Sequence, residues 1–169
     1  MLFLRGDLTV MMSIEERKNS EAARFHIEMM QGIINRMASN SSNCKSWCIA
    51  VITAIFALYA SKEDCPQALI IVCIVPTFLF FCTDSYYLGL ERMFRNFQSS
   101  FYAKINDPDS DDWLKEIFRV SSAANETKSY PKIFISSLKV LADGMMSVST
   151  AGFYGLVVVM IIAVWSVLN

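Results

Sequence analysis

The residue in this chain with the clearest capacity for chemistry is an aspartate that stands directly after an apolar segment. Asp84 follows Gln67–Thr83, a run of 17 residues without a charge. A carboxylate at the edge of such a segment is costly when it faces lipid, so it needs water, a cation or a basic partner. The sequence leaves two roles open. One is helix capping or pairing with Lys45 or Arg92; the other is a ring of carboxylates that attracts cations in an oligomer.

The cysteines and the single histidine do not form a recognisable catalytic or metal site. None of the five cysteines belongs to a C-x-x-C pair, and Cys44 with Cys48 would leave the tetrahedral shell of a zinc site incomplete. His26 lies beside an apolar stripe, which favours a polar packing role over that of a ligand or pH switch. The sequence holds no nucleophile elbow, phosphate loop or HExxH motif. We therefore expect no enzyme activity and no cofactor.

A short acidic segment, N-D-P-D-S-D-D-W, is similar to the start of a calcium-binding loop. Asp107, Asp109 and Asp111 alternate as the first ligands of such a loop do. The position that requires glycine holds Asp112, however, and the position of the bidentate glutamate holds Phe118. The sequence therefore predicts no metal at this segment.

The composition predicts an all-α membrane protein. Hydrophobic residues make up 54% of the chain, the mean hydropathy is +0.37 and 18% of the residues are charged, against about 25% in soluble domains. The net charge of −1 gives no reason to expect a nucleic-acid partner. A membrane-spanning helix needs roughly 20 apolar residues. We expect three transmembrane helices, at 46–61, 67–86 and 144–169, with the first two joined as a hairpin by the link K-E-D-C-P.

An N-terminal helix is expected in the region 13–42, and residues 1–12 are interpreted as disordered or as a mis-assigned start. The sequence Ser13-Ile-Glu-Glu has the pattern of a capping box, which predicts where this helix begins. We expect it to end near Ser39, with the charged residues, Arg17 among them, mostly off its buried face. The apolar residues that predict this face recur every three or four positions; they are Ala22, Phe25, Met29, Ile33 and Met37.

The second apolar segment passes without a turn signal into charged residues, in the sequence T-D-S-Y-Y-L-G-L-E-R-M-F-R-N-F. A single helix from Gln67 to Ile105 would measure about 58 Å, roughly twice the hydrocarbon thickness of a bilayer. Half of this helix should therefore stand outside the membrane. Together with the N-terminal helix it is expected to form a cytoplasmic helical stalk.

Two shorter helices are expected in the remainder of the polar region 87–143. Asp111 or Asp112 should cap one that runs from Trp113 to about Val120. Pro131 suits the first position of another. Its sequence K-I-F-I-S-S-L-K-V-L-A is amphipathic, with both lysines on the polar side. We expect this helix to lie at the membrane surface before the third span.

The distribution of basic residues predicts the orientation of the chain. Fourteen Lys or Arg residues lie before Ser46 or between Leu88 and Asp143, whereas the hairpin link holds one, Lys62. Basic loops stay in the cytoplasm. We therefore expect the N-terminus and the region 87–143 in the cytoplasm, and the C-terminus outside.

Small and polar residues within the apolar segments are candidates for helix packing or for a pore lining. Three spans per subunit suit a homo-oligomer around a shared axis. Ser147, Ala151 and Gly155 form a stripe that would let helices approach closely, either within the chain or between subunits. The alternative to pore lining is that the hydroxyls bond carbonyls of their own helix. The pore-lining candidates are Asp84, Thr83, Thr53, Thr77, Ser147, Thr150 and Ser166.

An anionic signal would need several basic residues close together. Arg24 and Arg36 on the first helix, with Arg92 and Arg95 on the extended one, are the compact supply. The alternative is that these four side chains form a solvated, ion-paired face.

Several strings along the chain resemble small multi-pass prokaryotic proteins: F-H-I-E-M-M-Q-G-I-I-N-R-M-A-S-N-S-S-N-C-K-S-W, D-S-Y-Y-L-G-L-E-R-M-F-R-N-F and a late F-Y-G. The architecture is similar to the SLATT-type effectors of bacterial anti-phage defence, including the channel-forming subunits of Hailong-type systems. This resemblance implies a toxic, homo-oligomeric pore of abortive infection in the bacterial inner membrane. It also implies control by a nucleotide or oligonucleotide signal from a neighbouring nucleotidyltransferase. The competing hypothesis is a non-conducting membrane scaffold that recruits a cytoplasmic partner.

Overall fold

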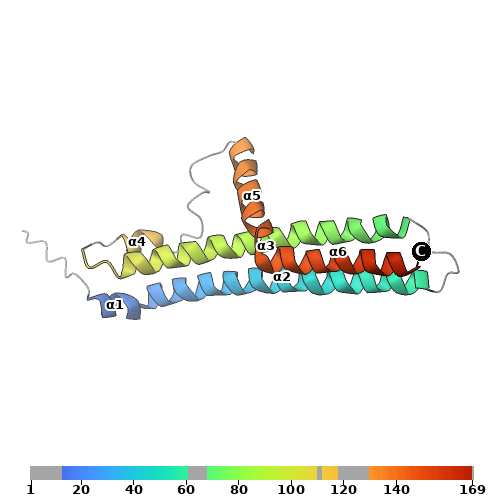
Figure 1. Cartoon of the computed structure of the whole chain (residues 1–169). Coiled ribbons are helices and arrows are strands. Elements are labelled where there is room, and N and C mark those ends of the chain that lie inside the picture. Colours follow the sequence, from blue (N-terminus) through green and yellow to red (C-terminus); the bar gives the residue numbers. More distant parts are fainter. Residues whose placement is uncertain (1–12, 61–67, 110–111, 118–129, 169) are drawn as a thin grey trace, which may run out of the picture.

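The computed structural model describes residues 13–60, 68–109, 112–117 and 130–168. Within these ranges the chain is helical and contains no strand, which confirms the all-α class. The two longest helices lie side by side and antiparallel, a third lies along one half of this pair, and a fourth projects from it at a steep angle (Figure 1). The helices are α1 (Ile14–Asn19), α2 (Glu21–Ala60), α3 (Ala68–Ile105), α4 (Trp113–Glu116), α5 (Tyr130–Met145) and α6 (Val148–Leu168).

Three of these helices, α2, α3 and α6, are long and apolar enough to cross a membrane, as predicted. The 40 residues of α2 and the 38 of α3 measure about 60 Å each at 1.5 Å per residue, against roughly 30 Å for a hydrocarbon core. Each therefore has an apolar half, next to the 60–68 connection, and a half rich in charge. We call residues 21–45 of α2 and 85–105 of α3 the polar half of the pair.

The N-terminal helix differs from the expected one in where it breaks. The capping box at Ser13 is confirmed, since the Ser13 amide donates to Glu16 Oε2 at 2.8 Å and the Glu16 amide donates to Ser13 Oγ at 3.2 Å. The helix ends at Asn19, however, because Ser20 is extended and its hydroxyl accepts a bond from the Ala23 amide at 3.3 Å. Ser20 is therefore both the C-cap of α1 and the residue that caps the start of α2 at Glu21.

No break separates the N-terminal region from the first span, contrary to the expected end near Ser39. Helix α2 runs through S-N-S-S-N at residues 39–43 and on to Ala60. Ser and Asn have low helix propensity, which favours an end there. Packing along the whole length of α3 supplies the stability that the local sequence lacks (Figure 1).

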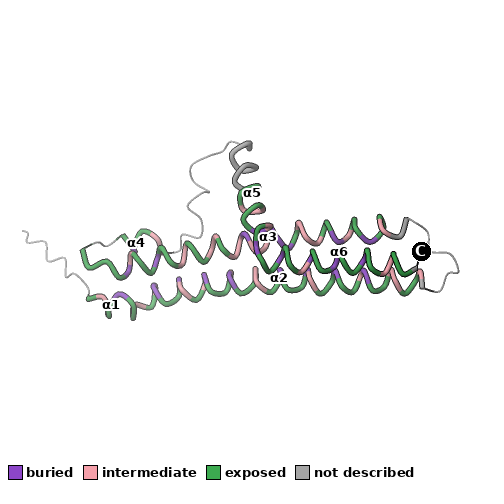
Figure 2. The backbone as a smooth tube through the Cα atoms, viewed as in Figure 1, coloured by how far each residue is buried: buried purple, intermediate pink, exposed green. Residues whose placement is uncertain are grey.

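The buried face of α2 lies beside the predicted stripe. Phe25, a member of that stripe, is 55% exposed, and the prediction of the exact face was wrong. Two polar residues, His26 and Ser41, lie on the buried face, so the spacing of apolar residues alone does not identify it. Successive buried residues of α2 are three, four or seven positions apart, as expected for one face of a helix. The buried residues are Ala23, His26, Met30, Ile34, Ser41, Cys44, Cys48 and Ile52 (Figure 2).

Arg17 also departs from the expected pattern, since its side chain is 1% exposed. Its Nη1 donates to the Asp107 carbonyl at 2.7 Å, just beyond the C-terminus of α3. A cation is favourable at that end of a helix dipole. In the same polar half, the buried apolar residues Ala23, Phe101, Ile105 and Trp113 form a small cluster.

The connections after α3 are also shifted from their expected positions. Helix α4 ends at Glu116, and Asp112 precedes it without a side-chain capping bond; Asp111 and 118–120 lie outside the described residues. Helix α5 begins at Tyr130, one residue before Pro131. The third span begins at Val148, not Gly144, because Gly144 still belongs to α5 and packs against α3.

Two glycines bring α5 and α3 into backbone contact. A Cβ placed on Gly144 would lie 1.8 Å from the Ser85 carbonyl oxygen, and one placed on Gly89 would lie 1.9 Å from the Val140 carbonyl oxygen. Such distances require glycine at both positions. Arg92 Nη1 also donates to the Asp143 carbonyl at 2.6 Å, at the C-terminus of α5. The end of α5 is therefore fixed to α3 next to Asp84.

Candidate functional site

A polar cluster is buried where α2, α3 and the first turns of α6 meet. Lys45 lies about 22 Å from Ala60 along α2, and Asp84 lies about 24 Å from Ala68 along α3, counted at 1.5 Å per residue. Both residues are thus close to one boundary of a hydrocarbon layer roughly 30 Å thick. Ser41 is one turn from Lys45 on the same face of α2.

Asp84 is held by two side chains of α2. Its Oδ2 lies 2.7 Å from Lys45 Nζ, and its Oδ1 accepts a hydrogen bond from the Ser41 hydroxyl. Lys45 Nζ also donates to Ser41 Oγ at 3.2 Å, which closes a triangle of interactions. The Asp84 side chain has no exposed area and that of Lys45 is 19% exposed. Lys45 is one of the two partners that the sequence suggested; the other, Arg92, binds the Asp143 carbonyl instead.

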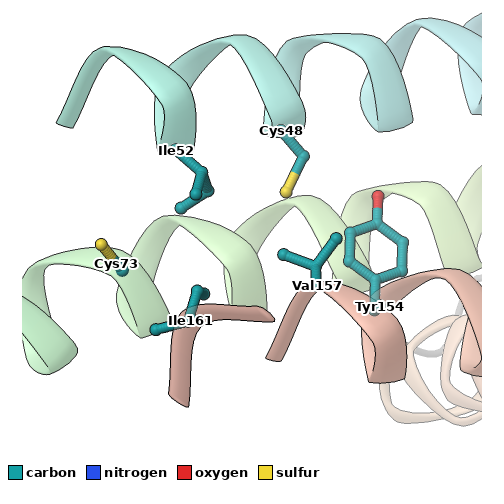
Figure 3. Packing of buried hydrophobic residues seen from close by; sticks show 6 residues of the cluster. All are labelled: Cys48, Ile52, Cys73, Tyr154, Val157 and Ile161. Carbon is teal, nitrogen blue, oxygen red and sulfur yellow. The ribbon is translucent and has the colours of Figure 1, made fainter. Parts of the chain in front are cut away.

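Further hydroxyl groups surround this ion pair. Tyr154 projects from α6 toward α2 (Figure 3), and its hydroxyl lies close enough to Asp84 to interact with the carboxylate. The hydroxyls of Ser85 and Thr150 are buried and make no hydrogen bond to the residues that the structure describes. A buried polar group without a hydrogen bond costs about 1–3 kcal/mol. The cluster thus has more hydrogen-bonding capacity than this arrangement uses.

Below the polar cluster the apolar half is closely packed. Cys48 and Ile52 of α2, Cys73 of α3 and Tyr154, Val157 and Ile161 of α6 form its core (Figure 3). Phe80, Phe81 and Phe153 pack against the same core. Tyr154 belongs to both regions, with its ring in the apolar core and its hydroxyl at the ion pair. A movement of α6 would therefore change the surroundings of Asp84.

The structure separates the predicted pore-lining residues into two groups. Asp84, Thr77, Ser147 and Thr150 are buried, whereas Thr53 and Thr83 are exposed on the outer surface of the chain. Three of the candidate hydroxyls donate to carbonyls of their own helices, which is the alternative to pore lining given above. They are Thr77 to Cys73 at 2.8 Å, Thr83 to Leu79 at 2.9 Å and Ser166 to Ala163 at 2.8 Å.

The stripe of small residues is partly open. Ser147 is buried within the chain, but Ala151 and Gly155 are exposed, and a Cβ on Gly155 would meet nothing within 4 Å. These two residues, with Phe78 and Phe81, line an apolar groove of about 420 Å³ between α3 and α6. The described part of the chain does not fill this groove, so both alternatives for the stripe stay open.

Enlarging Gly155 is expected to weaken association between subunits without unfolding the subunit. A Cβ at position 155 meets nothing within 4 Å in the chain, but the larger side chain of Gly155→Leu would separate helix backbones at a close interface. The oligomer mass in detergent, measured by light scattering, should fall relative to the parent. Leu156→Phe, at a neighbouring residue that is 72% exposed, is the control and should leave the mass unchanged. An unchanged mass and thermal stability in Gly155→Leu would show that the stripe is not an interface.

The four candidate arginines for an anionic signal do not form one site in this structure. All four are exposed. Arg92 donates to the Asp143 carbonyl, and Arg95 pairs with Glu91 at 2.8 Å. Arg24 is about 18 Å along α2 from Arg36, at 1.5 Å per residue. Arg24 instead lines a surface hollow that includes two acidic residues, Glu21 and Glu28, a poor environment for an anion.

A second polar site lies in the polar half, around His26. The histidine is 2% exposed, and its ring centroid lies 4.5 Å from that of Phe101. Nearby, Lys104 and Glu116 form an ion pair at 2.6 Å and line, with His26, a cavity of about 210 Å³. His26 is about 28 Å along α2 from Lys45, in the charge-rich half of the helix. Its position agrees with the packing role inferred from the sequence.

The burial of His26 predicts a loss of stability at acid pH. Burial lowers the pKa of His26 from its usual value of 6.5, an effect that Glu116 partly opposes. Because the pKa is lower in the folded than in the unfolded state, the stabilisation is present above pH 6.5 and is lost as the pH falls below it. Thermal unfolding temperatures should therefore decrease more between about pH 7 and pH 5 for the parent than for His26→Gln. Parallel pH profiles would contradict this expectation.

Sequence reasoning did not identify Ser41, Tyr154, Gly89 or Gly144 as parts of this region. The four-residue spacing of Ser41 and Lys45 was the available signal for a shared helix face. The contacts of the two glycines depend on where α5 packs on α3, which no local pattern encodes.

Within the described residues, no group of three or more His, Cys, Asp or Glu side chains is placed to hold a metal ion. No protein-family model, curated protein or solved structure matches this chain.

Proposed function

We propose that this chain is the subunit of a gated, homo-oligomeric membrane channel. The observation that carries the proposal is the Ser41–Lys45–Asp84 cluster, with a carboxylate of no exposed area at the boundary of the apolar layer. Ionisable groups at such depth are expensive and commonly mark an ion pathway. A buried ion pair is also weak evidence for stability alone, because desolvation offsets most of its attraction.

The arrangement suggests a closed state in which Lys45 neutralises Asp84. Opening would separate α2 from α3, or move α6 and its Tyr154 hydroxyl away from the pair. Asp84 would then face water, and the subunits of the oligomer would repeat it as a ring that attracts cations. The unused hydroxyls of Ser85 and Thr150 lie in the same region and would line the opened path. Because the described chain is a closely packed three-helix unit, the pore would lie between subunits.

The biological setting follows from the sequence resemblance. We propose a toxic effector of bacterial anti-phage defence in the inner membrane, whose pore is controlled by a nucleotide-derived signal. In this proposal the N-terminus and the polar halves of α2 and α3 form a cytoplasmic stalk, and the C-terminus lies outside. The four candidate arginines do not form an anion site within the described residues, so the signal would bind at a surface that the oligomer completes or on a partner.

A membrane scaffold is the second candidate, and one observation favours it. The polar half of α2 and α3 projects about 30 Å beyond the hydrocarbon layer and exposes aromatic side chains, with Phe25 55% and Tyr102 41% exposed. Exposed aromatic residues are enriched where proteins bind one another. On this alternative the stalk recruits a cytoplasmic partner and the membrane part conducts nothing.

A membrane-potential dye distinguishes the two functions. Cells that express the chain alone, and liposomes that contain the purified protein with a potassium gradient, should lose their potential if the chain forms a channel. Gly155→Leu, which should weaken the oligomer, should slow this loss, whereas Leu156→Phe should not. An intact potential in liposomes and in cells, including infected cells, would reject the channel and leave the scaffold.

A further inference from the structure

Helix α5 projects from α3 at a steep angle instead of running along the long helices (Figure 1). Its 16 residues end at Met145, where Gly144 meets the Ser85 backbone beside Asp84. Asp84 marks the boundary of the apolar layer. If α2, α3 and α6 stand along the membrane normal, α5 must therefore lie along the membrane plane and at the level of its surface.

The described end of α5 presents different chemistry in different directions. Val140 and Gly144, one turn apart, face α3. Leu138, Leu141 and Met145 are spaced by three and four residues and share another face. Lys139 and Asp143 lie about 150° around the helix from these, at 100° per residue. A helix fixed to α3 on one side thus has an apolar face and a charged face on its two free sides.

Exposed apolar residues are found on α5, at the turn after it and on α6. Leu138 is 46% exposed, and beyond it Met146 and Val148, at the turn into α6, are 87% and 90% exposed. Leu156, further along α6, is 72% exposed. Apolar surfaces of this extent need lipid or a partner to cover them. Since α6 enters the membrane directly from this turn, lipid is the occupant that fits both segments.

We propose that α5 is a membrane-surface helix, with its Leu138 face inserted among the lipids of the bilayer that α6 crosses. Lys139 then points to water and to lipid phosphate groups, as basic residues of interfacial helices do. The contacts at Gly89, Gly144 and Arg92 fix this helix to α3. The proposal depends on the membrane assignment and not on whether the assembled protein conducts ions.

Spin labels on adjacent residues test the proposal. The keto amino acid p-acetylphenylalanine, introduced at Leu138 or at Lys139, carries a nitroxide without altering the native cysteines. In liposomes of phosphatidylcholine and phosphatidylglycerol, a label at Leu138 should collide mainly with oxygen, which concentrates in lipid. A label at Lys139 should collide mainly with the water-soluble complex Ni(II)-EDDA. We expect the ratio of the two collision rates to differ at least several-fold between the positions.

A label at Met146, which is 87% exposed, provides a second reading at a residue where added bulk meets little protein. It should behave as the label at Leu138 does. Equal access of the nickel complex to Leu138, Lys139 and Met146 would place α5 in water and overturn the proposal. Shielding of Leu138 and Met146 from both reagents would show that protein covers this face, which also overturns it. Neither result depends on channel activity.

Discussion

Replacing Lys45 with methionine is expected to lower the free energy of unfolding by about 3 kcal/mol, because it leaves the Asp84 carboxylate buried without its counter-charge. Asp84 has no exposed area, and its Oδ2 lies 2.7 Å from Lys45 Nζ. Methionine keeps most of the length of the lysine side chain, so the packing loss is small. Thermal and denaturant unfolding of the purified protein in detergent, compared with the parent, gives the change.

The double variant Lys45→Met with Asp84→Leu is the matched control. Replacing both members of a buried pair with apolar residues is often neutral or stabilising. The double variant should therefore be more stable than Lys45→Met alone, although the Ser41 hydroxyl then loses its acceptor. The single variant Asp84→Leu completes the comparison. If the changes in unfolding free energy of Lys45→Met and Asp84→Leu add up to that of the double variant, a direct interaction between Lys45 and Asp84 is contradicted.

Adding one methyl group at Gly144 is expected to destabilise the protein by about 3 kcal/mol or more. A Cβ there would lie 1.8 Å from the Ser85 carbonyl oxygen and 2.6 Å from its carbonyl carbon. Backbone atoms cannot move aside as a flexible side chain would, so α5 must shift away from α3. That shift would also strain the bond from Arg92 to the Asp143 carbonyl.

Gly152→Ala is the control for Gly144→Ala, because Gly152 lies in α6 and a Cβ there meets nothing within 4 Å. Alanine is favoured over glycine within helices by about 1 kcal/mol. The same substitution should therefore destabilise the protein at Gly144 and leave it unchanged or stabilise it at Gly152. The thermal unfolding temperatures of both variants test this. Equal temperatures would mean that α5 does not pack on α3 at this glycine.

The features that were predicted from the sequence depend on neighbours along the chain. The capping box at Ser13 is complete within four residues, and the apolar segments indicate membrane helices by length and composition. The unbroken helix from the second span to Ile105 was also visible, because no turn residues interrupt it. These elements do not depend on how the helices pack.

The features that were missed depend on contacts between helices. The buried face of α2 includes His26 and Ser41. Because both are polar, the apolar residues alone do not reveal which face is buried. Arg17 was expected on the polar side, but it is buried and bonds the Asp107 carbonyl beyond the C-terminus of α3. The role of Gly144 follows from its place at the α3–α5 crossing.

The partner of Asp84 was among the alternatives that the sequence left open, and the structure provides it through packing. Lys45 is distant in sequence, and the antiparallel pairing of α2 with α3 brings it to the carboxylate. From the sequence, pairing and membership of a cation-attracting ring were alternative roles for Asp84. Our proposal joins them as two states of one residue, paired when closed and facing water when open.

The most direct test of this account is the reversal potential of the reconstituted oligomer in a potassium chloride gradient, compared between the parent and Asp84→Asn. Asparagine keeps the shape of the side chain and removes its charge. We predict that the parent favours cations and that the variant has a weaker cation preference at low salt, with a smaller difference at high salt where charge is screened. An identical reversal potential for both proteins at low salt, with normal assembly of the variant, would contradict the proposal that Asp84 faces the ion path.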